Sequence, residues 1–172
     1  MENTKRNIFL QKNTLFGLCI GLSFIVISYL YYKTGRDITT NPRFNNLLML
    51  LSIAGAFIGT RKYREEVLAG KLSYGYALGC CLYLIGVAAV SYSVYLYFLY
   101  SAHPELVKSY VTTLEAAFQE IYGQNNPAAN LNNLLQTLIT PLFLALANIF
   151  SQLLTGIIFS LFLAGLLRKE KK

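Results

Sequence analysis

Residues 73–100 read SYGYALGCCLYLIGVAAVSYSVYLYFLY, and no Asp, Glu, Lys, Arg or His interrupts this run. At 1.5 Å per residue, a helix over these residues would be about 42 Å long. The hydrocarbon core of a bilayer is about 30 Å thick, and about 20 apolar residues are enough to cross it. The stretch therefore predicts a transmembrane helix that is tilted or projects beyond the core.

Three further uncharged stretches lie on either side of this helix, and each is long enough to cross a bilayer. The composition agrees with several membrane spans, since only 13% of the 172 residues are charged, against about 25% in soluble domains. The additional spans are expected at about residues 15–32, 44–60 and 141–167.

Two of these spans have irregular starts. The span at 44–60 is the shortest, and Asn45 and Asn46 make its beginning poorly defined. The last apolar stretch, residues 134–167, is too long for one crossing. Pro141 is expected to mark a kink, or the point where an interfacial helix turns into the span.

Residues 104–122 have a different pattern. Pro104 and Glu105 suit the first turn of a helix, and apolar residues then recur at helical spacing with polar residues between them. We expect an amphipathic helix that lies on the membrane surface or packs over the end of the bundle. The complete fold prediction is all-α: an integral membrane four-helix bundle with one amphipathic helix on its outer face, forming a single domain over residues 1–172.

Lys and Arg are unevenly distributed among the connecting segments. Eleven of the 15 lie in residues 1–14, 61–72 and 168–172. Because cytoplasmic segments of membrane proteins are enriched in these residues, we expect both the N-terminus and the C-terminus in the cytoplasm. The amphipathic helix would then lie on the outer side.

The first span resembles the apolar region of a signal peptide. It ends in Tyr29, Tyr31, Tyr32 and Lys33, whereas a cleavage site needs small residues. Tyrosine is also expected where a membrane helix meets the interface. We therefore interpret the span as an uncleaved first transmembrane helix.

The net charge of +7 does not indicate a nucleic-acid partner. The basic residues flank apolar spans, where Lys and Arg set orientation and contact lipid headgroups. The sequence contains no soluble basic domain that could bind nucleic acid. The lipid bilayer is the expected partner.

Residues with reactive side chains are few. Cys19, Cys80 and Cys81 lie in apolar stretches without CxxC spacing, and His103 is the single histidine. No HExxH, GxSxG or Walker motif occurs. The predicted spans also lack the charged residues that ion-coupled transporters place at depth. We expect no catalytic residue, metal site or cofactor, and a boundary or capping role for His103.

Small residues recur four positions apart in every span. Such residues let helix backbones approach closely in lipid, where helices gain little from hydrophobic burial against each other. We interpret them as packing positions within the bundle, with dimerisation through one of these faces as the alternative. The glycines are Gly17, Gly21, Gly55, Gly59, Gly75, Gly79 and Gly156, the last followed by Ser160 and Ala164.

The most polar intramembrane residues lie in the last span. Asn148, Gln152 and Thr155 share one face of a helix, and Ser151 lies beside them. They could form hydrogen bonds between helices. The other interpretation is a polar lining for a molecule that binds or permeates.

Residues 59–79 read GTRKYREEVLAGKLSYGYALG. This stretch, with Pro141 and the basic tail from Arg168 to Lys172, resembles a family of small bacterial membrane proteins known as domain of unknown function 4199. Tyr74 stands where the family more often has phenylalanine. The resemblance implies a four-helix protein of the inner, cytoplasmic membrane of Gram-negative bacteria, and it implies no activity, substrate or catalytic residue.

Function is expected to be non-enzymatic. The leading hypothesis is an inner-membrane accessory or scaffold protein that acts through helix packing on another membrane protein or on itself, with residues 101–137 presenting a surface to the partner. The alternative is a small passive channel or transporter-like protein in which Asn148, Gln152 and Thr155 line a path. A membrane enzyme acting on lipid ranks lowest, because no polar groups converge with His103 or Arg61.

Overall fold

The computed structural model describes residues 2–122, 135 and 137–169 of the chain. The described residues are helical and contain no strand, which confirms the prediction of an all-α fold. The one β-type pairing among them is an isolated bridge between Leu72 and Lys169. The helices are α1 (Glu2–Lys33), α2 (Pro42–Val67), α3 (Tyr74–Ala102), α4 (Pro104–Tyr122) and α6 (Pro141–Leu167).

Three of these helices are long and apolar enough to cross a membrane: Asn7–Lys33, Tyr74–Ala102 and Pro141–Leu167. The prediction of four such spans is therefore met for α1, α3 and α6 and not for α2. The reason lies in the ends of α2, where Asn45 and Asn46 at the start and the charged residues from Arg61 onward leave a short apolar centre.

Two helices are longer than the sequence predicted. α1 begins at Glu2 instead of residue 15, and α2 continues to Val67 instead of residue 60. Lys, Arg and Glu are good helix formers, so the loss of apolar character marks the edge of the membrane-compatible part and not the end of the helix. The amphipathic helix and the last helix have the predicted bounds.

Local capping fixes two of the starts. The Asn41 side chain accepts hydrogen bonds from the backbone N–H groups of Arg43 and Phe44, at 3.0 and 3.4 Å. The Thr140 hydroxyl accepts one from Phe143 N–H at 3.2 Å. Each cap precedes a proline in the first helical turn, which is a strong start signal because the fixed proline φ suits that turn.

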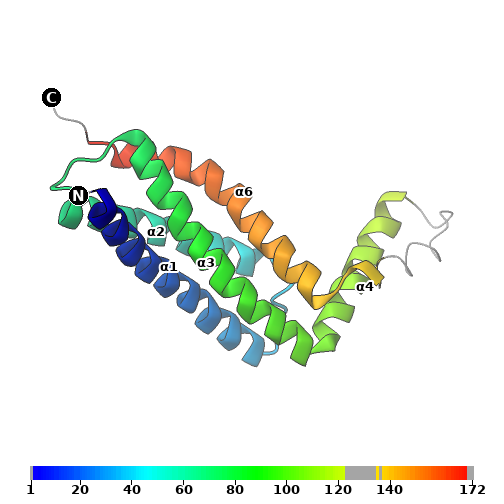
Figure 1. The fold of residues 1–172 in the computed structure, drawn as a ribbon. Coiled ribbons are helices and arrows are strands. Elements are labelled where there is room, and N and C mark those ends of the chain that lie inside the picture. Colours follow the sequence, from blue (N-terminus) through cyan, green and yellow to red (C-terminus); the bar gives the residue numbers. More distant parts are fainter. Residues whose placement is uncertain (1, 123–134, 136, 170–172) are drawn as a thin grey trace.

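α3 is the central helix, and it packs against α1, α2 and α6 (Figure 1). Small side chains such as Ala77, Ala88 and Ala89 are fully buried along it, so the neighbouring helices approach its backbone closely. The start of α1 and the end of α6 lie at one end of the bundle, and α4 lies at the opposite end (Figure 1).

The end of the bundle that holds the start of α1, here called the first end, is joined by polar contacts. Lys12 on α1 pairs with Glu66 on α2 at 2.7 Å. Leu72 and Lys169 exchange two backbone hydrogen bonds of 3.1 and 3.0 Å, which connect the start of α3 to the end of α6. Four helices are thus linked at this end.

At the second end, His103 ends α3 and lies next to α1 and α4. Its Nδ1 is 3.0 Å from the Tyr32 hydroxyl of α1 and 2.9 Å from Glu105 Oε1 of α4. The apolar side of α4, including the buried Val111, packs on the end of the bundle core. The structure therefore gives His103 the capping position that the sequence predicted.

Candidate functional site

Five of the glycines identified in the sequence lie where two helices meet closely. A Cβ on Gly17 would lie 2.7 Å from Val87 Cβ, and one on Gly21 would lie 2.8 Å from Ser91 Cβ, both on α3. Such distances are too short for real side chains, so only glycine fits there. The other three, at closest distances of 2.7 to 2.9 Å, are Gly55, Gly59 and Gly156.

Gly75 and Gly79 do not share this role. Apart from the adjacent residues and backbone of α3 itself, no atom of the described chain lies within 4 Å of a Cβ built on either residue. Gly75 and Gly79 have the same four-residue spacing as the packed glycines. Their side of α3 faces away from the neighbouring helices, however. They are not packing positions between helices of the described chain.

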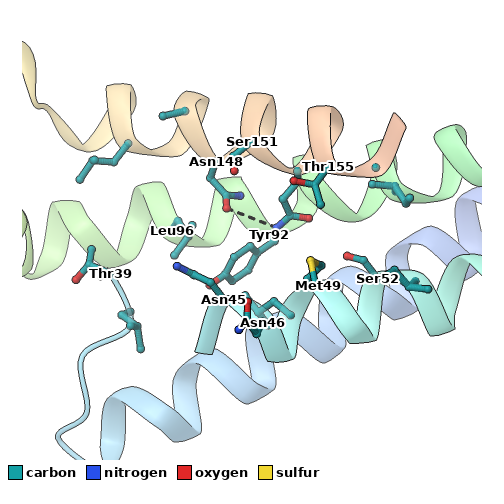
Figure 2. A pocket seen from close by; sticks show the side chains of 18 of the residues that line it. Thr39, Asn45, Asn46, Met49, Ser52, Tyr92, Leu96, Asn148, Ser151 and Thr155 are labelled. Atoms are coloured by element: carbon teal, nitrogen blue, oxygen red, sulfur yellow. Dashed lines mark hydrogen bonds between the residues drawn. The ribbon is translucent and has the colours of Figure 1, made fainter. Parts of the chain in front are cut away.

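The polar residues of α6 line a cavity of about 360 Å³ together with residues of α2, α3 and α4. Figure 2 shows Asn148, Ser151 and Thr155 of α6 on one side, α2 residues on the other, and Tyr92 of α3 between them. The polar face of α6 that the sequence predicted therefore faces a cavity. The polar lining residues are Thr39, Asn45, Asn46, Ser52, Tyr92, Tyr100, Tyr110, Asn148, Ser151, Gln152 and Thr155.

Asn148 makes a hydrogen bond between helices. Its Nδ2 donates to Ser93 Oγ of α3 at 2.7 Å, and its Oδ1 accepts a long hydrogen bond of 3.5 Å from Gln152 Nε2. The Oε1 atom of Gln152 is buried and has no hydrogen-bond partner among the described residues. The polar face is thus satisfied at Asn148 and left with an unused acceptor at Gln152.

The α2 side of the cavity was not predicted from the sequence. Asn45, Asn46 and Ser52 line it, although the sequence indicated only an irregular helix start at Asn45 and Asn46. The signal that could have been used is the spacing of Asn45 and Ser52, seven residues apart and hence on one helical face. Which helix that face meets depends on tertiary packing.

The lining of the cavity extends toward the first end of the bundle as far as Phe159 of α6. Gly156 also lines it, and its Cβ position is 2.9 Å from Ile85 Cγ2 of α3. A compact apolar cluster that includes Leu163 and Ala164 lies nearer the first end. At the other end of the cavity the lining includes Tyr100 and Tyr110.

No charged side chain lines the cavity in the part of the chain that the structure describes. No group of three or more His, Cys, Asp or Glu residues is clustered there either. Cys80 and Cys81 are buried, and the Thr60 hydroxyl is 3.3 Å from the Cys81 sulfur. The chemistry available in the cavity is neutral hydrogen bonding and apolar contact.

Comparison with known proteins gives a family. The family model that matches residues 15–169 is described as a protein of unknown function, DUF4199. The chain belongs to the DUF4199 family. The resemblance predicted from the sequence is therefore confirmed. No match was found among curated proteins or solved structures.

The residues that indicated DUF4199 form the connection from α2 to α3 at the first end. Gly70 has a φ of 81°, which favours glycine, and its N–H donates to the Arg64 carbonyl at 3.0 Å. Leu72 then pairs with Lys169. This DUF4199 motif therefore contributes to the turn and to the link with the end of α6, and it lies away from the cavity.

Proposed function

We propose that this DUF4199 protein is a non-enzymatic accessory protein of the bacterial inner membrane. It crosses the membrane four times, with both termini in the cytoplasm. Its α4 helix lies at the outer face and presents a surface to a partner protein. The single observation that carries this proposal is the position of α4 across the second end of the bundle, held by one apolar side while its other side is exposed.

The fourth crossing is α2, which runs back along α1. Near its start, the rings of Phe44 and Tyr31 have centroids 4.9 Å apart, and near its end Glu66 pairs with Lys12. The part of α1 between Lys12 and Tyr31 is about 29 Å long at 1.5 Å per residue, close to the thickness of the hydrocarbon core. A membrane crossed by α1 would therefore be crossed by α2, whose Asn45 and Asn46 line the cavity.

The orientation proposed for the bundle follows from its charges. Among the described residues, nine Lys and Arg lie at the first end, within residues 5–12, 61–71 and 168–169, and four lie at the second end, namely Lys33, Arg36, Arg43 and Lys108. Lys and Arg accumulate on the cytoplasmic side of membrane proteins. The first end is thus the cytoplasmic one in this proposal, and α4 is outside.

The exposed side of α4 suits contact with another protein helix. The hydroxyls of Thr112 and Thr113 donate back to the carbonyls of Lys108 and Ser109, at 3.0 and 2.9 Å. Their donors are used within the helix, and the side chains are short, so a partner can approach the helix closely. Ala116 continues this exposed face toward the end of α4.

Site-specific photocrosslinking in cells tests the proposal. A photoreactive amino acid at the exposed Thr113 is expected to yield an adduct with a discrete second protein. The same amino acid at Leu166 of α6, which is 75% exposed at the other end of the bundle, serves as the control and should yield no such adduct. An adduct of twice the chain mass would identify a second copy of this chain as the partner. Absence of any adduct at Thr113, together with purification of the chain alone in mild detergent, would contradict the proposal.

A passive path for neutral solutes is the second candidate function. The polar cavity at Asn148, Gln152 and Thr155 favours it. The compact apolar cluster with Leu163 and Ala164, which lies nearer the first end, argues against it. Solute flux into liposomes containing the protein, absent in an Ala147→Phe variant, would support this candidate over the accessory function.

A further inference from the structure

We infer that the cavity between α2 and α6 is a binding site for an uncharged lipid whose headgroup carries hydroxyl groups, such as a diacylglycerol. The site is separate from the exposed face of α4. It rests on the proposed four crossings, because these place its opening in the bilayer. The proposed accessory function needs only the α4 surface. This inference adds a lipid ligand to that function.

The lining determines the charge of the ligand. All polar groups of the cavity are amides and hydroxyls, and no charged side chain faces it in the described chain. A phosphate or carboxylate would lose its hydration there without gaining an opposite charge, which is strongly unfavourable. A neutral headgroup can replace its water contacts with the hydrogen bonds that the cavity offers.

Gln152 indicates that the headgroup donates hydrogen bonds. Its Oε1 atom is buried and has no partner in the described chain. A buried acceptor without a partner is costly, and a hydroxyl of the ligand would satisfy it. Asn148 holds the same amide from the other side through its contact with Gln152 Nε2.

The walls around these polar groups are apolar. Leu48 and Met49 of α2 and Phe159 of α6 contribute to the lining. A cavity that combines a few polar groups with apolar walls suits an amphipathic molecule and not a fully hydrated sugar. The volume of about 360 Å³ accommodates a headgroup and the first part of an acyl chain.

The opening of the cavity faces the surface that would lie in lipid. Asn45, Asn46, Ala147 and Ser151 line the cavity and are exposed, so the opening lies between α2 and α6. Large exposed apolar residues adjoin it, including Phe150, which is 67% exposed. These four residues lie in the halves of α2 and α6 nearer the second end. A lipid would therefore enter from the outer half of the bilayer with its chains remaining between the helices.

The test uses the full-length protein in lipid nanodiscs. The probe is a diacylglycerol that carries a diazirine on the acyl-chain carbon nearest the glycerol, and labelled residues are mapped by mass spectrometry. We expect labelling within residues 45–53 and 144–159. Unlabelled dioleoylglycerol should compete, whereas dioleoylphosphatidic acid, which has the same chains and a charged headgroup, should not.

Variants connect the labelling to the cavity. Gln152→Leu should reduce it about three- to tenfold, as expected for the loss of one neutral hydrogen bond. Ala147→Phe should reduce it further by filling the opening, and it provides a second variant if Gln152→Leu does not fold. Leu154→Phe changes an exposed position of the same helix and should leave labelling unchanged.

Equal competition by dioleoylphosphatidic acid, or unchanged labelling in both cavity variants, would overturn the inference. Competition by free glycerol at the level of dioleoylglycerol would also overturn it, because the occupant would then be a soluble hydroxyl compound. The labelling does not depend on the exposed face of α4. It can therefore succeed where the search for a protein partner fails, and it can fail where that search succeeds.

Discussion

Arg64 of α2 binds the end of α6: its Nη1 donates to the backbone carbonyl of Leu167 at 3.0 Å. The last carbonyls of a helix have no partner within it, and a cation at that position also interacts favourably with the helix dipole. The Arg64 side chain is only 14% exposed. This contact joins two helices that both line the cavity farther along the bundle.

Replacing Arg64 should weaken the whole bundle. Arg64→Met removes the donor while keeping most of the side-chain volume, and it leaves the Leu167 carbonyl without this partner. We expect the free energy of unfolding to fall by about 1.5–3 kcal/mol, the value typical of a hydrogen bond to a charged group. Unfolding in mixed micelles, followed by circular dichroism, measures it. Lys62→Met, which removes an exposed pair to Glu66 at 3.7 Å, is the control and should change little.

Glycine substitutions should separate packed from unpacked positions. Gly21→Ala places a methyl group 2.8 Å from Ser91 Cβ and 3.2 Å from the Ala88 carbonyl oxygen. Overpacking of this kind typically costs about 1–3 kcal/mol. Gly79→Ala meets nothing within 4 Å and should leave the stability unchanged or slightly higher. Equal destabilisation by both substitutions in the same unfolding assay would contradict the helix packing described above.

Stability should fall in acid because of the pair between Lys12 and Glu66. The hydrogen bond from Lys12 holds the pKa of Glu66 below its usual value of 4.5, against a smaller opposing effect of burial. A carboxylate with a lowered pKa stabilises the fold above the unfolded-state pKa, and the contribution is lost as the pH falls through the folded-state pKa. We expect the melting temperature to drop below about pH 4.5.

The control for this pH dependence is Glu66→Gln, which cannot ionise. Its melting temperature should be slightly lower at neutral pH and should depend less on pH in acid. High salt should reduce the difference between the two proteins, because exposed ion pairs are screened. An identical acid profile for both proteins would show that other carboxylates account for the loss.

Local sequence signals predicted the helices whose ends carry capping residues. Pro104 with Glu105 gave the start of α4, and Pro141 gave the start of α6. The start of α1 was missed, because hydropathy reports where a helix can lie in lipid and says little about where its hydrogen bonding begins. The same reason explains why α2 extends past Arg61.

The cavity was only half predicted. Asn148, Gln152 and Thr155 were identified because polar residues are conspicuous in an apolar span. Their counterparts on α2 were read as an irregular helix start, and no local pattern indicates that α2 residues line a cavity together with α6. Gly75 and Gly79 illustrate the converse, because their spacing matches that of the packed glycines while the rotation of α3 leaves them free of neighbours.

The outer position of α4 and the opening of the cavity to the outer leaflet both require that α2 crosses the membrane. Cysteine labelling in spheroplasts with a membrane-impermeant maleimide tests this most directly, using Thr34→Cys before α2 and Lys62→Cys near its end, each in a cysteine-free background. Four crossings with a cytoplasmic N-terminus predict that the cysteine at 34 is labelled and the one at 62 is protected until the membrane is opened. Labelling of both positions, or protection of both, would place them on one side of the membrane and would contradict the proposed crossing of α2.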